Sequence, residues 1–468
     1  MDSLYDLRIY DLESVDNDFD PMTPEWWAEE GLVRFEENLF ASQTFSRDYD
    51  EDFARPGEVI NLHRVGTSVA HRKPEQRSIE LTNQTSEDVQ VKLNQHVYTA
   101  FSVSDREIKR NVGNLIDKYI IPNARAMAEA VDLFCQSQMY QWYFNTGGTL
   151  GSSVTYSDLV DTNRRMDTNN APLSERTLIV GPTTKADLLN TDKLTEYRMT
   201  EDGGPILNGF LTRGSSFDIV MSQTSPEIID NMAKTMEAVN GNHPVGATTI
   251  SISEPDADIP TGSWILIAGD DVPQRVVTGA DESASNEDIV IAPGLRRAVD
   301  ANAEVQVFTP GVVDTIAAVV DERFVDGTTI LAGYDGPIPF DAFSNDPQVS
   351  QGVSFGDGGH VYGIWKIGDG TIILSEPLVS NVAQGAAINL MPPGNYNMAI
   401  RPEAATLVNR PMDLPSQSVS AALAQFNNLS LRVIMSYDHK FMAHVISLDA
   451  LFGFKVLDPT QGAILLGG

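Results

Sequence analysis

Apolar and polar residues alternate along residues 57–104, and this period of two predicts β-strands. In SIELTNQTSEDVQVKLNQHVYTAFSV the polar run NQTSED separates two alternating runs. The pattern predicts a long β-hairpin with one apolar face, formed by Ile79, Leu81, Val89, Val91 and Leu93. A two-stranded ribbon is marginal alone in water, so something must cover that face. No nearby sequence supplies an obvious cover, and we expect another copy of the chain to supply it.

Between residues 105 and 143 apolar residues recur every three to four positions, which predicts the longest helix of the chain. The predicted apolar face comprises Ile108, Val112, Leu115, Ile116, Tyr119, Met127, Val131, Phe134, Cys135 and Met139. Pro122 predicts a kink or break in that helix. Because Cys135 falls on the apolar face, a buried thiol is favoured over a nucleophile.

A third pattern lies near the N-terminus, where Thr23 and Pro24 predict the start of a short amphipathic helix. Its apolar stripe, together with Trp26, Trp27 and Phe35, needs a surface to pack on. We interpret these three aromatic residues as contacts between subunits. The alternative is an ordinary helix in the core of the same molecule.

Residues 245–310 change character, because five short apolar runs are separated by Gly, Pro and Asp turns. These runs are ATTISIS, SWILIAG, QRVVTG, EDIVIAP and AEVQVFTP. Their spacing predicts a small all-β barrel or sandwich inserted at 241–312. This stretch carries 11 acidic and 3 basic residues, a net charge of −8, so we expect it to face solvent.

The remaining segments mix strands with short helices. ERTLIVGP predicts a buried strand and KADLLNTDKL a helix, and strands are expected in 204–227, 361–379 and 429–457. Within NYNMAIRPEAATLVNRPMDLP a strand runs into a short Ala-rich turn that is closed by two prolines. Together these elements predict an α+β protein with several domains in 468 residues.

Composition narrows the possible functions. The net charge of −33 makes a specific nucleic-acid binder improbable, because phosphate contacts need clustered Lys and Arg, and it favours basic partners. A salt-adapted organism is the alternative explanation. Residues 1–60 carry 17 acidic residues against 4 Arg, whereas residues 396–468 carry 5 of each sign. This uneven distribution indicates an acidic arm rather than uniform adaptation to salt.

No apolar run is long enough to cross a membrane, and the acidic N-terminus is unlike a signal peptide.

No catalytic or ligand-binding motif stands out. The sequence contains no GxxxxGK[ST] or HExxH motif, and its single cysteine excludes an internal disulfide. The acidic residues near the N-terminus lack the glycine and the closing Glu of a calcium loop. GDGGH at 356–360 is interpreted as a flexible loop, with a ligand site as the alternative. We therefore expect no catalytic residues, no metal and no cofactor.

The order of the elements resembles the major capsid proteins of tailed bacteriophages with the Hong Kong 97 fold. The resemblance is greatest to podovirus coat proteins that carry an inserted β-domain. It depends on QHVYTAFSVSDREIKRNVGNLIDKYIIPNARAMAEAVD, GFLTRGSSFDIVMSQTSPE, NMAIRPEAATLVNRP and SLRVIMSYDHKFMAHVISLDALFGFKVLDPTQGAIL. The resemblance covers most of residues 60–468.

The resemblance implies the following domains: an N-terminal arm at 1–56, an extended loop at 57–104, a spine helix at 105–146, a first peripheral and axial part at 147–240, the inserted domain at 241–312, an axial domain at 313–428 and peripheral return strands at 429–468.

It also implies hexamers and pentamers of an icosahedral head, built as a procapsid in the host cytoplasm and found in the virion. The implied partners are other copies, a scaffolding protein, a portal protein and packaged DNA bound without sequence specificity. Whether a decoration protein binds stays open. Another multimeric virion or surface-layer protein is the main alternative, and a hydrolase is the minor one.

Overall fold

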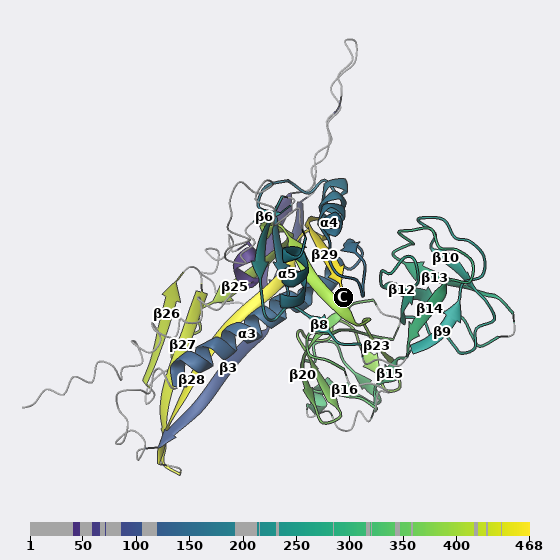
Figure 1. The fold of residues 1–468 in the computed structure, drawn as a ribbon. Helices are drawn as coiled ribbons and strands as arrows, with labels where there is room; N and C mark the ends of the chain where they lie inside the picture. Colours follow the sequence, from purple (N-terminus) through teal and green to yellow (C-terminus); the bar gives the residue numbers. More distant parts are fainter. Residues whose placement is uncertain are drawn as a thin grey trace, which may run out of the picture. The chain divides into compact units, whose positions relative to one another are not determined.

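The computed structural model describes the chain in segments: residues 41–46, 59–65, 71, 86–104, 119–191, 213–214, 216–230, 234–283, 285–314, 319, 321–341, 347–356, 359–415, 420–426, 429–440 and 442–468. The chain forms two compact units. Figure 1 shows their helices and strands, coloured along the sequence. The larger unit comprises Asn38–Val97, Met127–Arg410 and Leu451–Gly468, and the smaller unit includes Tyr98–Ala126 and Pro411–Ala450. No described helix is long and apolar enough to span a membrane.

A seven-stranded sheet forms the centre of the larger unit. Its order is β4-β29-β24-β5-β7-β6, with β8 beside β24. The strands are β4 (Thr146–Gly148), β29 (Gly462–Gly467), β24 (Gly394–Ile400), β5 (Thr177–Val180), β7 (Phe217–Met221), β6 (Arg213–Gly214) and β8 (Glu227–Ile228). Every residue of β24 and β29 is buried, which explains why neither strand alternates between apolar and exposed polar residues. The buried Asn397 of β24 is satisfied by hydrogen bonds to Thr184 Oγ1 and to the Leu465 carbonyl.

Two helices accompany this sheet. α4 (Tyr156–Thr168) begins with a capping box, in which the Thr155 backbone N–H donates to Asp158 Oδ2 at 2.8 Å. α5 (Pro182–Leu189) begins at a proline, whose missing N–H has no role at the first helical position. Leu159 of α4 and Leu188 of α5 are fully buried in one core with Phe217, so the two helices and the sheet share a hydrophobic interior.

A six-stranded sheet with its own core corresponds to the predicted all-β segment. Its order is β10-β13-β12-β11-β14-β9. The strands are β9 (Lys234–Ala238), β10 (Thr249–Ile252), β11 (Trp264–Ile267), β12 (Gln274–Thr278), β13 (Glu287–Ala292) and β14 (Glu304–Phe308). All five predicted strands are confirmed. The sixth strand, β9, lies before residue 241, so the sheet begins earlier than the predicted segment. The buried residues Ile250, Ile265 and Ile289 belong to its separate core.

A second six-stranded sheet has the order β15-β23-β19-β20-β21-β18. Its strands are β15 (Gly311–Val312), β18 (Ile338–Pro339), β19 (Gly352–Phe355), β20 (Tyr362–Gly368), β21 (Thr371–Leu374) and β23 (Ala387–Leu390). A small sheet adds β16 (Val325–Asp326), β17 (Thr329–Ile330) and β22 (Val382–Ala383), preceded by the 3-10 turn η8 (Glu322–Phe324). Ile330 and Ile372 lie in one core, so the two sheets form a single body.

The NYNMAIRPEAATLVNRP segment connects two strands. β24 is followed by the 3-10 turn η9 (Pro402–Ala404) and then by β25 (Ala405–Arg410). β25 pairs with the end of β28 (Ala443–Val456), in a register from Ala405 opposite Val456 to Arg410 opposite Leu451. The Ala-rich turn therefore transfers the chain from one sheet to another. Further turns are η2 (Ala41–Thr44) and η10 (Pro459–Gln461).

The predicted long helix is described from residue 119. α3 (Ile121–Ser137) continues into the 3-10 turn η6 (Gln138–Trp142), and residues 105–118 lie outside the described part of the chain. Pro122 lies near the start of α3, and residues 119 and 120 before it are also helical, so the described helix is not broken at Pro122; a kink there stays a prediction. The predicted apolar face is confirmed for Met127, Val131 and Cys135, which are at most 2% exposed.

The smaller unit contains an antiparallel meander. β26 (Ser420–Phe426) pairs with β27 (Leu429–Asp438), and β27 pairs with the first part of β28. β3 (Gln95–Ser104) contributes residues from Tyr98 onward to this unit. Among the described residues β26 pairs with β27 alone, so its other edge is open.

Candidate functional site

The ribbon at residues 59–92 is the most unusual element of the larger unit. β1 (Val59–Val65) and β2 (Ser86–Lys92) are antiparallel, in a register from Val59 opposite Lys92 to Val65 opposite Ser86. They form a sheet of only two strands in the described part of the chain. A ribbon of this size has too few partners to be stable by itself.

The structure corrects the predicted hairpin in one respect. The strand at 86–92 pairs with 59–65, whereas the sequence pattern placed its partner around Ile79 and Leu81 and a turn at NQTSED. Residues 86–88 of that polar run belong to β2. A ribbon that no other strand flanks tolerates polar residues, so the polar run did not mark the end of the strand.

Three of the predicted contact residues anchor the ribbon to the body of the same chain. Val91 is fully buried and Leu93 is 9% exposed, and both pack against Val408. Val89, Leu451 and Leu457 are half-buried around them. The cover that we expected from another copy is therefore supplied within the chain for Val91 and Leu93. Trp26, Trp27, Phe35, Ile79 and Leu81 lie outside the described residues, and a role for them between subunits stays a prediction.

A glycine allows the end of the ribbon to approach β28. A Cβ atom on Gly453 would lie 2.4 Å from the carbonyl oxygen of Lys92. That oxygen belongs to the backbone of β2 and cannot rotate away as a side chain would. The anchor therefore depends on the absence of a side chain at this position.

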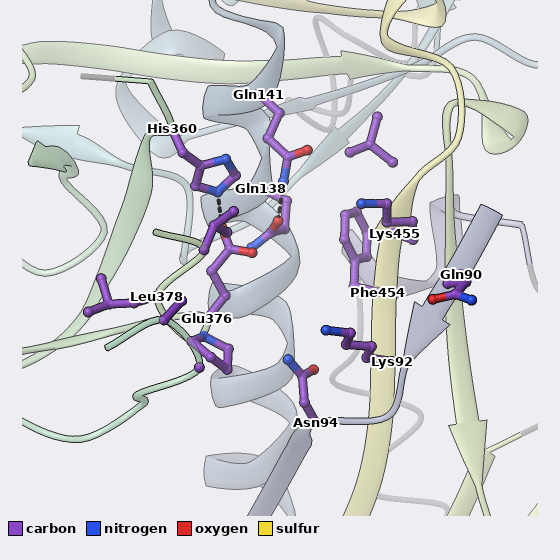
Figure 2. A pocket seen from close by; sticks show the side chains of 15 residues that line it. Gln90, Lys92, Asn94, Gln138, Gln141, His360, Glu376, Leu378, Phe454 and Lys455 are labelled. Carbon is purple, nitrogen blue, oxygen red and sulfur yellow. Dashed lines mark hydrogen bonds and ion pairs between the residues drawn. The ribbon is translucent and has the colours of Figure 1, made fainter. Parts of the chain in front are cut away.

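A pocket of about 640 Å³ opens beside the anchored end of the ribbon (Figure 2). Its lining comes from segments far apart in the sequence: Gln90, Lys92, Asn94, Gln138, Gln141, Ala332, Gly333, His360, Glu376, Pro377, Leu378, Val379, Phe454, Lys455 and Val456. Figure 2 shows Lys92 and Lys455 on one wall and the His360–Glu376 pair on the opposite wall. A space of this volume suits a group larger than a single ion.

The polar groups of the pocket are only partly satisfied. His360 Nε2 lies 2.6 Å from Glu376 Oε1, so this carboxylate already has a partner. Gln141 Nε2 donates to Gln138 Oε1 at 2.6 Å. Gln138 is 2% exposed, and its Nε2 is buried without an acceptor. A buried donor without an acceptor costs about 1–3 kcal/mol.

The apolar part of the pocket is held rigidly from behind. The Phe454 ring packs edge-to-face on Phe45 at a centroid distance of 5.0 Å and on Phe134 at 5.9 Å. On the other wall Tyr362 accepts a hydrogen bond from the Val379 N–H at 2.9 Å, and burial raises the pKa of the Tyr362 hydroxyl. The Val379 side chain itself is 61% exposed at the rim. The pocket thus combines a fixed aromatic floor with charged and amide groups.

The sequence pattern does not reveal this pocket. His360 ends the GDGGH loop, for which a ligand site was the alternative interpretation, and this is the one signal that pointed toward it. Among the described residues no group of three His, Cys, Asp or Glu side chains is arranged to hold a metal ion.

No family model matches the chain, and no curated protein matches it. The chain is similar to a solved structure from Mycobacterium phage Che8, with 13% identity, a TM-score of 0.42 and coverage of 91% of this chain and 90% of that chain. It is also similar to a capsid structure of the Cyanophage P-SCSP1u, with 11% identity, a TM-score of 0.40 and coverage of 88% and 84%. A third similar structure is the asymmetric unit of the bacteriophage PhiM1 mature capsid, with 8% identity, a TM-score of 0.39 and coverage of 92% and 86%.

Proposed function

We propose that this chain is a structural protein, the major capsid protein of a tailed phage, which assembles into hexamers and pentamers of an icosahedral head around double-stranded DNA. The ribbon β1–β2 is the observation that carries this proposal. Seven residues of each strand pair only with each other in the described part of the chain, and a cluster at one end anchors them. An element with two open edges is suited to pairing or packing with another copy.

The charge supports the same role. A net charge of −33 opposes adhesion to packaged DNA, because like charges repel within a Debye length of about 8 Å at physiological ionic strength. The excess of acid in residues 1–60 would attract a basic partner, as a scaffolding protein would be. The proposal also includes a portal protein as a partner and assembly in the host cytoplasm.

Assembly of a closed shell is expected to be multivalent. Each ribbon would add a contact that is weak alone, and many such contacts within one particle raise the overall stability strongly. The open edge of β26 in the smaller unit offers a second place for pairing between copies.

Particle size tests this proposal. The purified chain would be followed by sedimentation velocity over a wide concentration range and viewed by negative-stain electron microscopy. Rings of six or five copies, or closed particles, are expected. Flat sheets or tubes without icosahedral order would instead identify a surface-layer protein, and a monomer at every concentration would reject assembly altogether.

A further inference from the structure

The pocket beside the ribbon has the charge and the shape to receive a segment of another chain. Lys92 and Lys455 line it, are exposed, and form no ion pair with any described residue. The single carboxylate of the pocket, Glu376, is held by His360. The lining therefore presents more positive than negative charge, on a chain that is otherwise strongly acidic.

The buried amide of Gln138 adds a second and independent requirement. Its Nε2 lacks an acceptor, while its Oε1 is fixed by Gln141. A carboxylate or carbonyl oxygen that entered the pocket could accept this hydrogen bond after a small rotation of the amide. The ligand must therefore carry acceptor oxygens, which agrees with the positive charge of the two lysines.

The apolar residues of the pocket exclude a simple anion as the whole ligand. Phe454, Leu378 and Val379 also line the pocket and offer contact area for apolar side chains. A volume of about 640 Å³ is also far larger than one small anion needs. The matching ligand is an extended peptide that alternates acidic and apolar residues.

We propose that the pocket binds the acidic N-terminal segment of a second copy of this chain, and this inference rests on the proposed function, in which copies are neighbours. Residues 1–20, MDSLYDLRIYDLESVDNDFD, contain 7 acidic residues and 1 Arg, a net charge of −6. Leu and Tyr residues stand among these acids, as the apolar floor of the pocket requires. Forty residues precede Ala41, and a chain of that length can reach at most about 130 Å, enough to reach a neighbouring molecule.

Binding is tested with a labelled peptide of residues 1–20. The binding protein is the full-length chain in which the acidic residues of segment 1–20 are changed to Asn or Gln. These changes prevent the protein's own segment from competing with the peptide. We expect the peptide to bind, and at least tenfold weaker binding to the Lys92→Gln, Lys455→Gln double variant. Lys366→Gln, an exposed lysine outside the pocket, is the matched control and should change binding less than twofold. Salt should weaken the binding, because the Debye length falls from about 10 Å at 0.1 M to about 3 Å at 1 M. Equal binding to the double variant would overturn the inference.

A crosslink distinguishes a second copy from the same chain. One full-length variant carries Asp6→Cys and another carries Lys92→Cys, and the native Cys135 is buried. Oxidation of the mixture should produce a disulfide that joins position 6 of one chain to position 92 of another. Neither variant alone contains both cysteines, so neither alone can form this disulfide. If the disulfide forms only within a chain that carries both cysteines, the occupant is the chain's own segment and the proposal fails.

Failure of this inference differs from failure of the proposed function. Suppose that particles assemble normally and that the double variant binds the peptide as tightly as the parent does. The proposed function would then stand, and the proposed role of the pocket would be rejected. A chain that forms no particles at any concentration would reject the function, whatever the peptide result.

Discussion

Two nitrogen atoms of the Arg296 guanidinium, Nη1 and Nη2, are buried without a hydrogen-bond acceptor. The backbone N–H of Arg296 donates to Asp270 Oδ1 at 2.9 Å, but Nη1 and Nη2 of its side chain have no acceptor of this kind. Burial, together with a smaller contribution from the positive charge of Arg165, lowers the pKa of Arg296 to about 9. Keeping this charged side chain buried therefore lowers the free energy of unfolding of the chain.

Replacing Arg296 with Met should stabilise the chain at pH 7. We expect a gain of about 1–3 kcal/mol in the free energy of unfolding, the usual cost of buried donors without partners. As pH rises through 9, the folded chain loses the proton, while the unfolded chain, in which the pKa of this arginine is higher, keeps it. The parent therefore gains stability, and the difference between parent and variant should shrink. Urea unfolding at pH 7 and pH 10 measures both effects. Arg297→Met, at an exposed arginine that donates to Thr149 Oγ1 at 3.2 Å, should give no gain.

Gly453 is the second residue whose environment makes a sharp prediction. Gly453→Ala would place a Cβ 2.4 Å from the Lys92 carbonyl oxygen, so the end of β2 must move. We expect a loss of about 1–3 kcal/mol, as for overpacking in a core. Hydrogen–deuterium exchange should become faster in β1 and β2. Gly359→Ala, where a Cβ would meet nothing within 4 Å, is the control and should leave that exchange unchanged.

At the scale of elements, the smaller unit depends on a charge pair between neighbouring strands. Arg432 of β27 stands opposite Asp449 of β28. Its Nε and Nη2 donate to the two carboxylate oxygens at 3.0 and 2.5 Å, and Nη1 donates to the Asp413 carbonyl at 2.7 Å. The hydrogen bonds that Arg432 donates to Asp449 raise the pKa of Arg432. Because Asp449 is 5% exposed, loss of its charge removes two hydrogen bonds and the opposite charge from a guanidinium that is itself largely buried.

Asp449→Asn should therefore destabilise the meander of β26, β27 and β28 by about 3–5 kcal/mol, the usual result of breaking a buried pair. Exchange of the β27 and β28 amides with deuterium, followed alongside unfolding in urea, measures the loss. Asp413→Asn changes an exposed carboxylate nearby and should shift stability by less than about 0.5 kcal/mol. Equal effects of the two substitutions would contradict a role for the pair.

Elements could be predicted where the pattern of one strand reflects its own burial. In EDIVIA the alternate residues Ile289 and Ile291 are buried, and five of the six strands of that sheet were predicted correctly for this reason. The strand with which a given strand pairs cannot be predicted from such a local pattern. β2 pairs with residues 59–65 rather than with Ile79 and Leu81, because pairing depends on the path of the chain and not on local alternation. The pocket was missed for a similar cause, since its lining gathers only when distant segments fold together.

At the scale of the whole molecule, the proposed function requires the chain itself to hold the ribbon before another copy can bind it. Val91 and Leu93 pack on Val408, and they form a small cluster compared with the cores of the sheets. Burying such a side chain contributes about 1.5–3 kcal/mol. A loss of this size can release the ribbon while the separate cores remain intact.

The double substitution Val91→Ser and Leu93→Ser should therefore leave the fold of the sheets and block the formation of particles. Circular dichroism should match that of the parent, while sedimentation should show smaller species at the concentrations at which the parent assembles. Val89→Ser, at a half-buried position of the same strand, should have a weaker effect on both measurements. If the double variant unfolds as a whole, the anchor belongs to the main core. If it assembles as the parent does, a held ribbon is not what joins one copy to the next.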